Sequence, residues 1–333
     1  MQNIPVIDVS PLRSDDPADR AACASVLGRA CRDTGFFYAT GHGIPPSIAT
    51  GIFDAARAFF ALPTGQKDQV SYARSAHNRG YIGLGQERLD AATPPDRKEA
   101  FNIGLELAPD DPELLAGKPF RGINLWPDLP GWRDQALAYY AACTRLTVEI
   151  HRGFALDLGL DEDFFTPRLE RPMTTLRLLH YPPGDGADLG AGTHTDYGNL
   201  TILATDGVAG LQVRRRDGTW VDAPHSPGAF VCNIGDCLMR WTNDVYVSTP
   251  HRVRQPATER YSVAYFADPN PDALVEVIPA CVRPGERPLY PPILAGTYLR
   301  SRLDPTYNHW KASTASQPAV IDILPIRDDT ASR

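Results

Sequence analysis

Three residues in one stretch of this 333-residue chain most strongly limit what it can fold into. His194 and Asp196 are separated by one residue, and His251 follows after fifty-four intervening residues. Alternate residues of a β-strand point to the same face, so His194 and Asp196 can reach one ion from the end of one strand, whereas His251 must arrive from elsewhere. Two imidazoles and one carboxylate, with open positions opposite, are the ligand set of non-haem Fe(II) sites that activate oxygen.

The residues between these three side chains favour short strands separated by turns. Turn signals stand at Asp217-Gly218, Pro227-Gly228 and Gly235-Asp236. The strands expected between the turns cover residues 200–204, 211–214, 230–234 and 238–241. This pattern predicts a mainly β fold with flanking helices, built on a double-stranded β-helix (a cupin-like jelly roll) whose mouth can hold a small site.

Each part of the pattern is weak evidence when taken alone. A His-x-Asp pair is common, and a single later histidine is more often a satisfied core or surface residue than a ligand. Arg260-x-Ser262 carries almost no information by itself. The order, the spacing and the strand context agree within one compact region, and this agreement favours a metal site.

Several motifs together resemble one known family. They are THTDYGNLTIL, NIGD followed by RWTND, STPHRV and RYSVAYF, preceded by IPVIDVS, GFFYATGHGI, RGYIG and LRLLHYPP. On these motifs the chain is similar to the 2-oxoglutarate- and Fe(II)-dependent oxygenases of the isopenicillin N synthase-like family, from about residue 4 to about residue 303.

The resemblance implies roles for named residues. The Fe(II) ligands would be His194, Asp196 and His251. Arg260 would pair with the distal carboxylate of 2-oxoglutarate, Ser262 would donate a hydrogen bond to the same carboxylate, and Tyr181 would help to bind it. Plant members of the family often have Asn two residues before this Tyr, where the chain has Leu179, so this corner of the co-substrate site departs from that pattern.

The reaction implied is oxidation, most often hydroxylation, of a small-molecule substrate, with molecular oxygen consumed and succinate and carbon dioxide released. One alternative is an oxidase of the isopenicillin N synthase type that uses no 2-oxoglutarate, because such oxidases can use the Arg260 and Ser262 pair for their own substrate. An ethylene-forming reaction is a second alternative, and a non-catalytic metal-binding jelly roll is a remote third.

Two aromatic residues of the N-terminal half are candidates for the substrate pocket. Tyr81 and Phe101 are neighbours of the polar residues Arg79 and Asn102, a mixture that is typical of a small-molecule site. Ordinary packing between the N-terminal region and the jelly roll explains the same aromatics equally well.

Composition excludes other classes of function. The net charge of −7 argues against a nucleic-acid surface, and no apolar stretch is long enough to span a bilayer. The first residues lack the features of a signal peptide, so we expect a cytoplasmic protein, a monomer or weak homo-oligomer whose partner is a small molecule. The six cysteines form no CxxC pair, and buried free thiols are expected.

The domain organisation expected is one compact unit with three parts. An N-terminal helix and strand region (1–172) packs on the jelly-roll oxygenase core (173–303), and a tail (304–333) follows. Helical patterns cover residues 19–32, 46–61 and 132–160.

Overall fold

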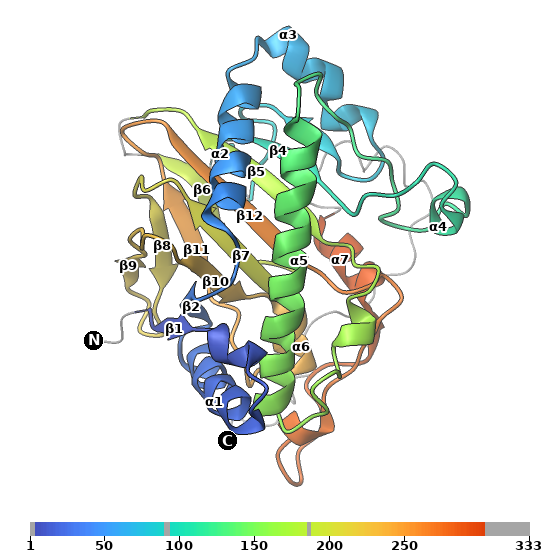
Figure 1. Cartoon of the computed structure of the whole chain (residues 1–333). Coiled ribbons are helices and arrows are strands. Elements are labelled where there is room, and N and C mark those ends of the chain that lie inside the picture. Colours follow the sequence, from blue (N-terminus) through green and yellow to red (C-terminus); the bar gives the residue numbers. More distant parts are fainter. Residues whose placement is uncertain (1–3, 90–93, 185–187, 304–333) are drawn as a thin grey trace, which may run out of the picture.

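A computed structural model of the protein describes residues 4–89, 94–184 and 188–303. Two β-sheets lie at its centre, one of eight strands and one of four, and helices cover the outside of the larger sheet (Figure 1). The strands are β1 Val6–Asp8, β2 Phe36–Thr40, β3 Gly80–Ile82, β4 Glu99–Ile103, β5 Thr175–Tyr181, β6 Leu189–His194, β7 Leu200–Thr205, β8 Leu211–Arg214, β9 Trp220–Asp222, β10 Phe230–Ile234, β11 His251–Arg254, β12 Arg260–Ala267, β13 Leu274–Val275 and β14 Ile293–Leu294. The helices are α1 Pro17–Asp33, α2 Pro46–Phe60, α3 Thr64–Lys67, α4 Pro112–Leu115, α5 Trp132–Asp157, α6 Asp236–Trp241 and α7 Ala295–Leu303.

The order of the strands shows how the sheets are assembled. The larger sheet runs β1-β2-β10-β7-β12-β5-β4-β3, and the smaller one runs β6-β11-β8-β9. Apart from β9, which pairs with β8 in the smaller sheet, strands β5 to β12 alternate between the two sheets as expected of a jelly roll, which confirms the predicted fold class. Strands from the N-terminal part extend the larger sheet at both edges, β1 and β2 at one and β3 and β4 at the other.

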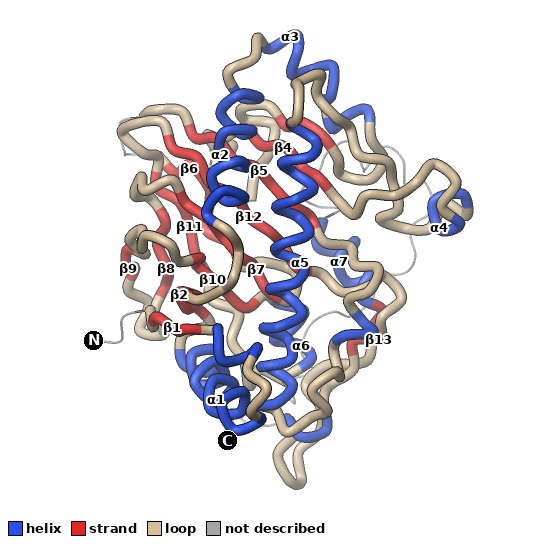
Figure 2. Tube along the Cα trace, viewed as in Figure 1, coloured by secondary structure: helices blue, strands red, loops and turns tan. Residues whose placement is uncertain are grey.

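The two faces of the larger sheet have different neighbours. On β5 the side chains alternate, so Leu176 and Leu178 face α2 and α5, whereas Arg177 and Leu179 line a cavity between the sheets. Helices α2 and α5 lie side by side across the outer face (Figure 2). The cavity is therefore enclosed by one face of each sheet.

The three predicted long helices are present with bounds close to those expected. Helix α5 begins after Gly131, whose φ of 72° is in the left-handed region, and continues for 26 residues without a proline. Its buried side chains recur about every third or fourth residue, the period that seats one face of a helix on a sheet. Tyr140 shows this contact, because its ring lies 5.3 Å from that of Tyr265 on β12.

The strand predicted at residues 238–241 is wrong, because these residues form most of α6. A short apolar run does not distinguish a buried strand from one turn of a buried helix. Leu and Met are strong helix formers, and Asp236 lies in the first turn, where a carboxylate stabilises a helix. The helix buries Cys237, Leu238 and Trp241, which a spacing of three to four residues brings to one side.

Two further expectations concern cysteines and membranes. All six cysteine thiols are free and buried, as expected. No helix in the described ranges combines the length and the apolar character that a bilayer crossing requires. The division at residues 172 and 303 stays a prediction, and the tail at 304–333 lies outside the described residues.

Candidate active site

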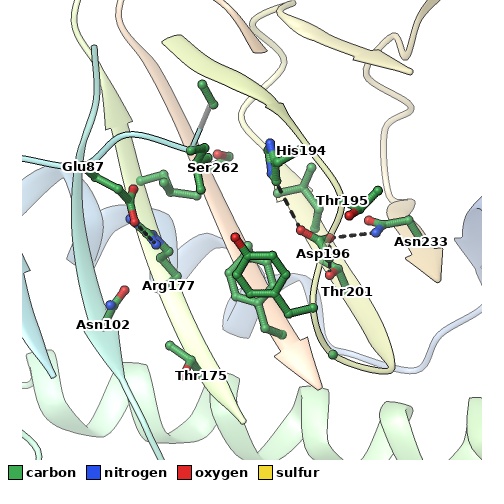
Figure 3. Close-up of a pocket in the computed structure, with 18 of the residues that line it drawn as sticks. Glu87, Asn102, Thr175, Arg177, His194, Thr195, Asp196, Thr201, Asn233 and Ser262 are labelled. Atoms are coloured by element: carbon green, nitrogen blue, oxygen red, sulfur yellow. Dashed lines mark hydrogen bonds and ion pairs between the residues drawn. The ribbon is translucent and has the colours of Figure 1, made fainter. Parts of the chain in front are cut away.

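Strands β6 and β11 bring the three predicted metal ligands together. His194 is the last residue of β6 and pairs in register with His251, the first residue of β11, so their rings lie 4.3 Å apart. Asp196 follows two residues after His194, and its Oδ1 lies 3.7 Å from His194 Nε2 and 3.6 Å from His251 Nε2. One ligand atom from each residue lies within 4.8 Å of the other two, close enough to hold one ion (Figure 3).

Backbone carbonyl groups fix the orientation of both imidazoles. His194 Nδ1 lies 2.8 Å from the carbonyl oxygen of Gly192, and His251 Nδ1 lies 3.1 Å from that of Thr249. A carbonyl oxygen can only accept, so Nδ1 carries the proton in each ring and Nε2 presents its lone pair toward Asp196. Burial, reinforced by the nearby His251, lowers the pKa of His194 to about 4, so this imidazole is neutral near pH 7 and can bind a cation.

Two neighbouring side chains orient the carboxylate. Thr201 Oγ1 and Asn233 Nδ2 both donate to Asp196 Oδ2, over 2.5 and 2.7 Å, and leave Oδ1 directed at the imidazoles. Burial alone would raise the pKa of Asp196, but the two imidazoles and these hydrogen bonds outweigh it and lower the pKa. The site therefore offers two imidazole nitrogen donors and one anionic oxygen. Thr201 was missed from the sequence, although it stands within the THTDYGNLT motif.

A close approach of two backbones holds the loop that carries Asp196. The Asp236 N–H donates to the carbonyl oxygen of Asp196 over 2.7 Å. A Cβ at Gly235 would lie 2.3 Å from the carbonyl oxygen of Gly198, so only glycine allows this contact. The turn after β10 thus fixes the position of the carboxylate from behind.

The predicted co-substrate residues form a second cluster on β12 and β5. The Arg260 side chain is buried, and it donates from Nη1 to Ser262 Oγ over 3.3 Å and from Nε to the carbonyl oxygen of Val208 over 3.2 Å. Its guanidinium carbon lies 4.8 Å from the centre of the Tyr181 ring. Within the described part of the chain Arg260 has no carboxylate partner, and a buried cation of this kind is ready to receive an anionic ligand.

Both clusters line a single cavity between the two sheets, with a volume of about 160 Å³. A cavity of roughly 150 Å³ already accommodates a ligand of the size of benzene. Apolar side chains such as Leu203, Leu211 and Val253 form much of the wall between the polar clusters. The arrangement can therefore hold small molecules next to a metal ion and away from bulk water.

A third polar group, unanticipated from the sequence, lies opposite the metal ligands. Arg177 on β5 forms a two-fold ion pair with Glu87, at 3.0 and 2.6 Å, and Lys98 Nζ lies 3.0 Å from the same carboxylate. Lys98 also pairs with the buried Asp96. Figure 3 shows Glu87, Arg177 and Asn102 on one side of the cavity, with His194 and Asp196 on the other. Arg177 stands in the LRLLHYPP motif, and its place in this motif was the only feature of the sequence that could have indicated a role at the site.

The structure does not bring Tyr81 and Phe101 into the cavity. Both are buried, and both pack against Phe59 of α2 on the outer face of the sheet, with ring separations of 5.7 and 4.7 Å. The Tyr81 hydroxyl donates to Glu99 Oε2 over 2.6 Å. Asn102, next to Phe101 on β4, lines the cavity instead, because adjacent residues of a strand point to opposite faces. Arg79, which lies just before β3, lines the cavity as well.

Comparison with known proteins identifies the families and relatives to which this chain is similar. The family described as "non-haem dioxygenase in morphine synthesis N-terminal" matches residues 4–129, and the "2OG-Fe(II) oxygenase superfamily" matches residues 172–269. The 2-oxoglutarate-Fe(II) type oxidoreductase hxnY of Emericella nidulans is 37% identical over 92% of this chain and 91% of its own length. Homoarginine-6-hydroxylase 2-ODD-233 of Oryza sativa is 38% identical over 89% of this chain and 95% of its own.

A solved structure agrees with these relatives. A full-length protein of Neurospora crassa, solved in complex with alpha-KG, superposes with a TM-score of 0.81 and 33% identity, over 91% of this chain and 96% of that one. The same Neurospora protein has also been solved with alpha-KG and thymine.

Proposed function

The chain belongs to the 2-oxoglutarate- and Fe(II)-dependent oxygenases, and from this premise we propose which of its residues carry the reaction. As a member it is a dioxygenase that uses Fe(II), 2-oxoglutarate and molecular oxygen. One oxygen atom enters the substrate as a hydroxyl group, and the other enters the succinate that remains when 2-oxoglutarate loses carbon dioxide. The observation that carries the assignment of residues is the His194, Asp196 and His251 cluster, which shares a cavity with the buried cation of Arg260.

The Fe(II) ligands proposed are His194 Nε2, His251 Nε2 and Asp196 Oδ1. The donor set fits the ion, because two neutral imidazoles and one carboxylate on one side leave the opposite side open. Bound iron would supply the activation of oxygen and of the keto acid. The protein contributes the fixed tautomers of both rings and the carboxylate orientation imposed by Thr201 and Asn233.

We assign the distal carboxylate of 2-oxoglutarate to Arg260 and Ser262. A guanidinium can hold a carboxylate through two parallel hydrogen bonds, and the Ser262 hydroxyl lies beside it on the same strand face. The Tyr181 ring lies against the guanidinium and limits its movement. Tyr181 on β5 is also the residue that pairs with Arg260 on β12 in the sheet. These contacts orient the co-substrate so that its other end points toward the metal ligands.

The primary substrate is a small molecule, and hydroxylation is the outcome that the relatives favour. One relative is named as a homoarginine hydroxylase, and another was solved with thymine. A reaction without 2-oxoglutarate receives less support, because the relatives are named for 2-oxoglutarate and the Neurospora protein was solved with alpha-KG bound. The cytoplasmic location and the monomeric or weakly oligomeric state stay predictions.

The assignment is tested with protein, Fe(II) and 2-oxoglutarate mixed without oxygen. A keto acid chelated to Fe(II) gives a weak visible charge-transfer band, and we expect this band to develop. Metal-loaded protein that shows no band with 2-oxoglutarate would favour an oxidase that uses no keto acid. Asp196→Ala protein is the control and should show no band, because it lacks the anionic ligand.

A further inference from the structure

The end of the cavity opposite the metal ligands holds a buried cation that the proposed function does not use. Arg79 lies just before β3, and its side chain is 2% exposed. Nη1 donates to the carbonyl oxygens of His77, at 2.9 Å, and Asn78, at 3.4 Å, and Nη2 donates to that of Phe120, at 3.4 Å. A guanidinium has five N–H donors, and Nε has no acceptor among the described residues, so its hydrogen bonding is incomplete.

The charge of Arg79 is also uncompensated within the described part of the protein. No ion pair there includes Arg79, whereas Lys98 and Arg177, which also line the cavity, are paired with Glu87 and Asp96. The Arg79 guanidinium therefore carries a positive charge that no described carboxylate compensates. A buried charge without a partner is destabilising, so a ligand that brings one negative charge would be favoured here.

The other charged groups near Arg79 do not change this balance. Arg121 raises the local positive potential, but it pairs with Glu113 at 2.8 Å. Asp268 is a further acidic residue that lines the cavity, and it faces the metal end, where its Oδ1 would lie 2.5 Å from a Cβ at Gly198. Burial lowers the pKa of Arg79 to about 10, so the guanidinium remains charged at neutral pH.

Asn102 adds a second unpartnered group to the same end of the cavity. Its side chain is fully buried, and its Nδ2 donates to Asn78 Oδ1 over 2.9 Å. Its Oδ1 receives no hydrogen bond from any described residue. Asn78 has a φ of 56°, in the left-handed region that asparagine adopts more readily than most non-glycine residues. A ligand with an N–H or O–H donor would satisfy the Asn102 oxygen.

We propose that the primary substrate is a small monocarboxylate that also carries an N–H or O–H donor. Its carboxylate binds Arg79, its donor binds the side-chain oxygen of Asn102, and the remainder of the molecule extends toward the metal ligands. The proposal rests on the proposed function, since it assumes that 2-oxoglutarate takes the Arg260 end of the cavity. A dianion would leave an excess negative charge, and a neutral molecule would leave Arg79 uncompensated.

The experiment compares the binding of matched ligands to the protein loaded with Mn(II) and 2-oxoglutarate. This complex forms the site but does not turn over. Calorimetry measures the binding of phenylacetate, phenylacetamide and mandelate, and of hexanoate, hexanamide and 2-hydroxyhexanoate. In at least one of these two series we expect the acid to bind about tenfold or more tightly than its amide. The 2-hydroxy acid, which carries the additional donor, should bind most tightly.

Variants test which residues cause the preference for acids over amides. Arg79→Gln should reduce the ratio of acid to amide affinity to near one, and Arg79→Lys should keep part of it. Asn102→Ala should remove only the advantage of the 2-hydroxy acids. The matched control is Arg57→Gln, which changes a half-exposed arginine of α2 outside the cavity and should leave every ratio unchanged.

The outcomes separate the inference from the proposed function. Equal affinity for acids and amides in the unaltered protein, tighter binding of the amides, or no binding in either series would overturn the inference while 2-oxoglutarate still binds. Loss of 2-oxoglutarate binding in the unaltered protein would overturn the proposed function instead. The comparison of acid with amide needs no variant, so misfolding of Arg79→Gln does not prevent the test.

Discussion

The inner and outer faces of the larger sheet both bury charged groups, but they satisfy them differently. On the outer face the Glu99 carboxylate accepts hydrogen bonds from Lys67 at 2.8 Å, Tyr81 at 2.6 Å and His180 at 2.7 Å. On the inner face the Arg260 guanidinium has only a hydroxyl and a backbone carbonyl as hydrogen-bond partners among the described residues.

This difference distinguishes a structural network from a binding site. A carboxylate that already receives three hydrogen bonds has little to gain from a ligand, whereas a buried cation without an anion has much to gain. Burial alone would raise the pKa of Glu99, but its three hydrogen bonds lower it, so the outer network is stable as it stands. We therefore expect substitution of Arg260 on the inner face to change ligand binding and substitutions around Glu99 on the outer face to change stability.

The largest effect is expected for Asp196→Ala. The variant removes the only anionic ligand of the proposed metal site and leaves two neutral imidazoles for a hard cation. Turnover should be abolished, and metal analysis after gel filtration should find the protein without iron. A variant that retains stoichiometric iron would contradict the assigned ligand set, and Asp54→Ala on the exposed side of α2 serves as control.

Arg260→Ala is expected to keep iron and to lose affinity for 2-oxoglutarate. Removing one partner of a buried charged pair costs about 2–5 kcal/mol, which corresponds to a dissociation constant roughly 30-fold higher or more. Titration of the charge-transfer band measures this constant directly. Unchanged 2-oxoglutarate affinity would show that Arg260 does not bind the co-substrate. We expect the variant to fold, because the guanidinium has no ion pair among the described residues.

Smaller side chains at Tyr81 or Phe101 test whether residues of the outer face affect stability rather than substrate binding. Tyr81→Phe loses a hydrogen bond to a charged group and Phe101→Leu loses packing against Phe59, so each should lower the free energy of unfolding by about 1–2 kcal/mol. Both variants should lose substrate oxidation and uncoupled 2-oxoglutarate consumption in parallel as stability falls. If substrate oxidation fails while uncoupled consumption and stability persist, these aromatics contact the substrate.

The smallest effect concerns His151, a buried histidine of α5 behind the site. Burial lowers its pKa to about 4, and its Nε2 accepts a hydrogen bond from Asn199 while Nδ1 donates to the carbonyl oxygen of Thr147. Between about pH 6.5 and pH 4 the unfolded chain binds a proton that the folded protein excludes, so this group lowers stability as the pH falls. His151→Gln should reduce the loss of stability between pH 7 and about pH 5.5 by about 1 kcal/mol. An identical pH dependence of urea denaturation in both proteins would contradict this.

The sequence was sufficient for the fold class and for the position of most elements near the site. The strands expected at residues 211–214 and 230–234 have the bounds found for β8 and β10, because turn residues mark both ends. The triad could also be located, since its residues occupy a recognisable motif at strand ends. Their roles as ligands remain proposals.

The opposite end of the cavity could not be predicted, for two physical reasons. Strands β3 and β4 are buried on both faces, so no alternation of polar and apolar residues shows which side meets the cavity. From the sequence, substrate contact and core packing therefore explained Tyr81 and Phe101 equally well. In the structure neither aromatic lines the cavity, whereas Arg79 and Asn102, close in sequence, do. The pair of Glu87 and Arg177 joins residues far apart in the sequence, and only the assembled sheet brings them together.

The placement of N-terminal strands at the edges of the larger sheet has a consequence for how the protein is made. Phe37 on β2 pairs with Cys232 on β10, nearly 200 residues later in the chain. A ribosome that adds 5–20 residues per second needs roughly 10–40 seconds to cover that distance. During this interval the apolar strand β2 has no antiparallel neighbour, and its free edge can pair with other nascent chains. Slower translation of the second half, or a lack of chaperones, should therefore lower the yield of native protein more than its final stability would suggest.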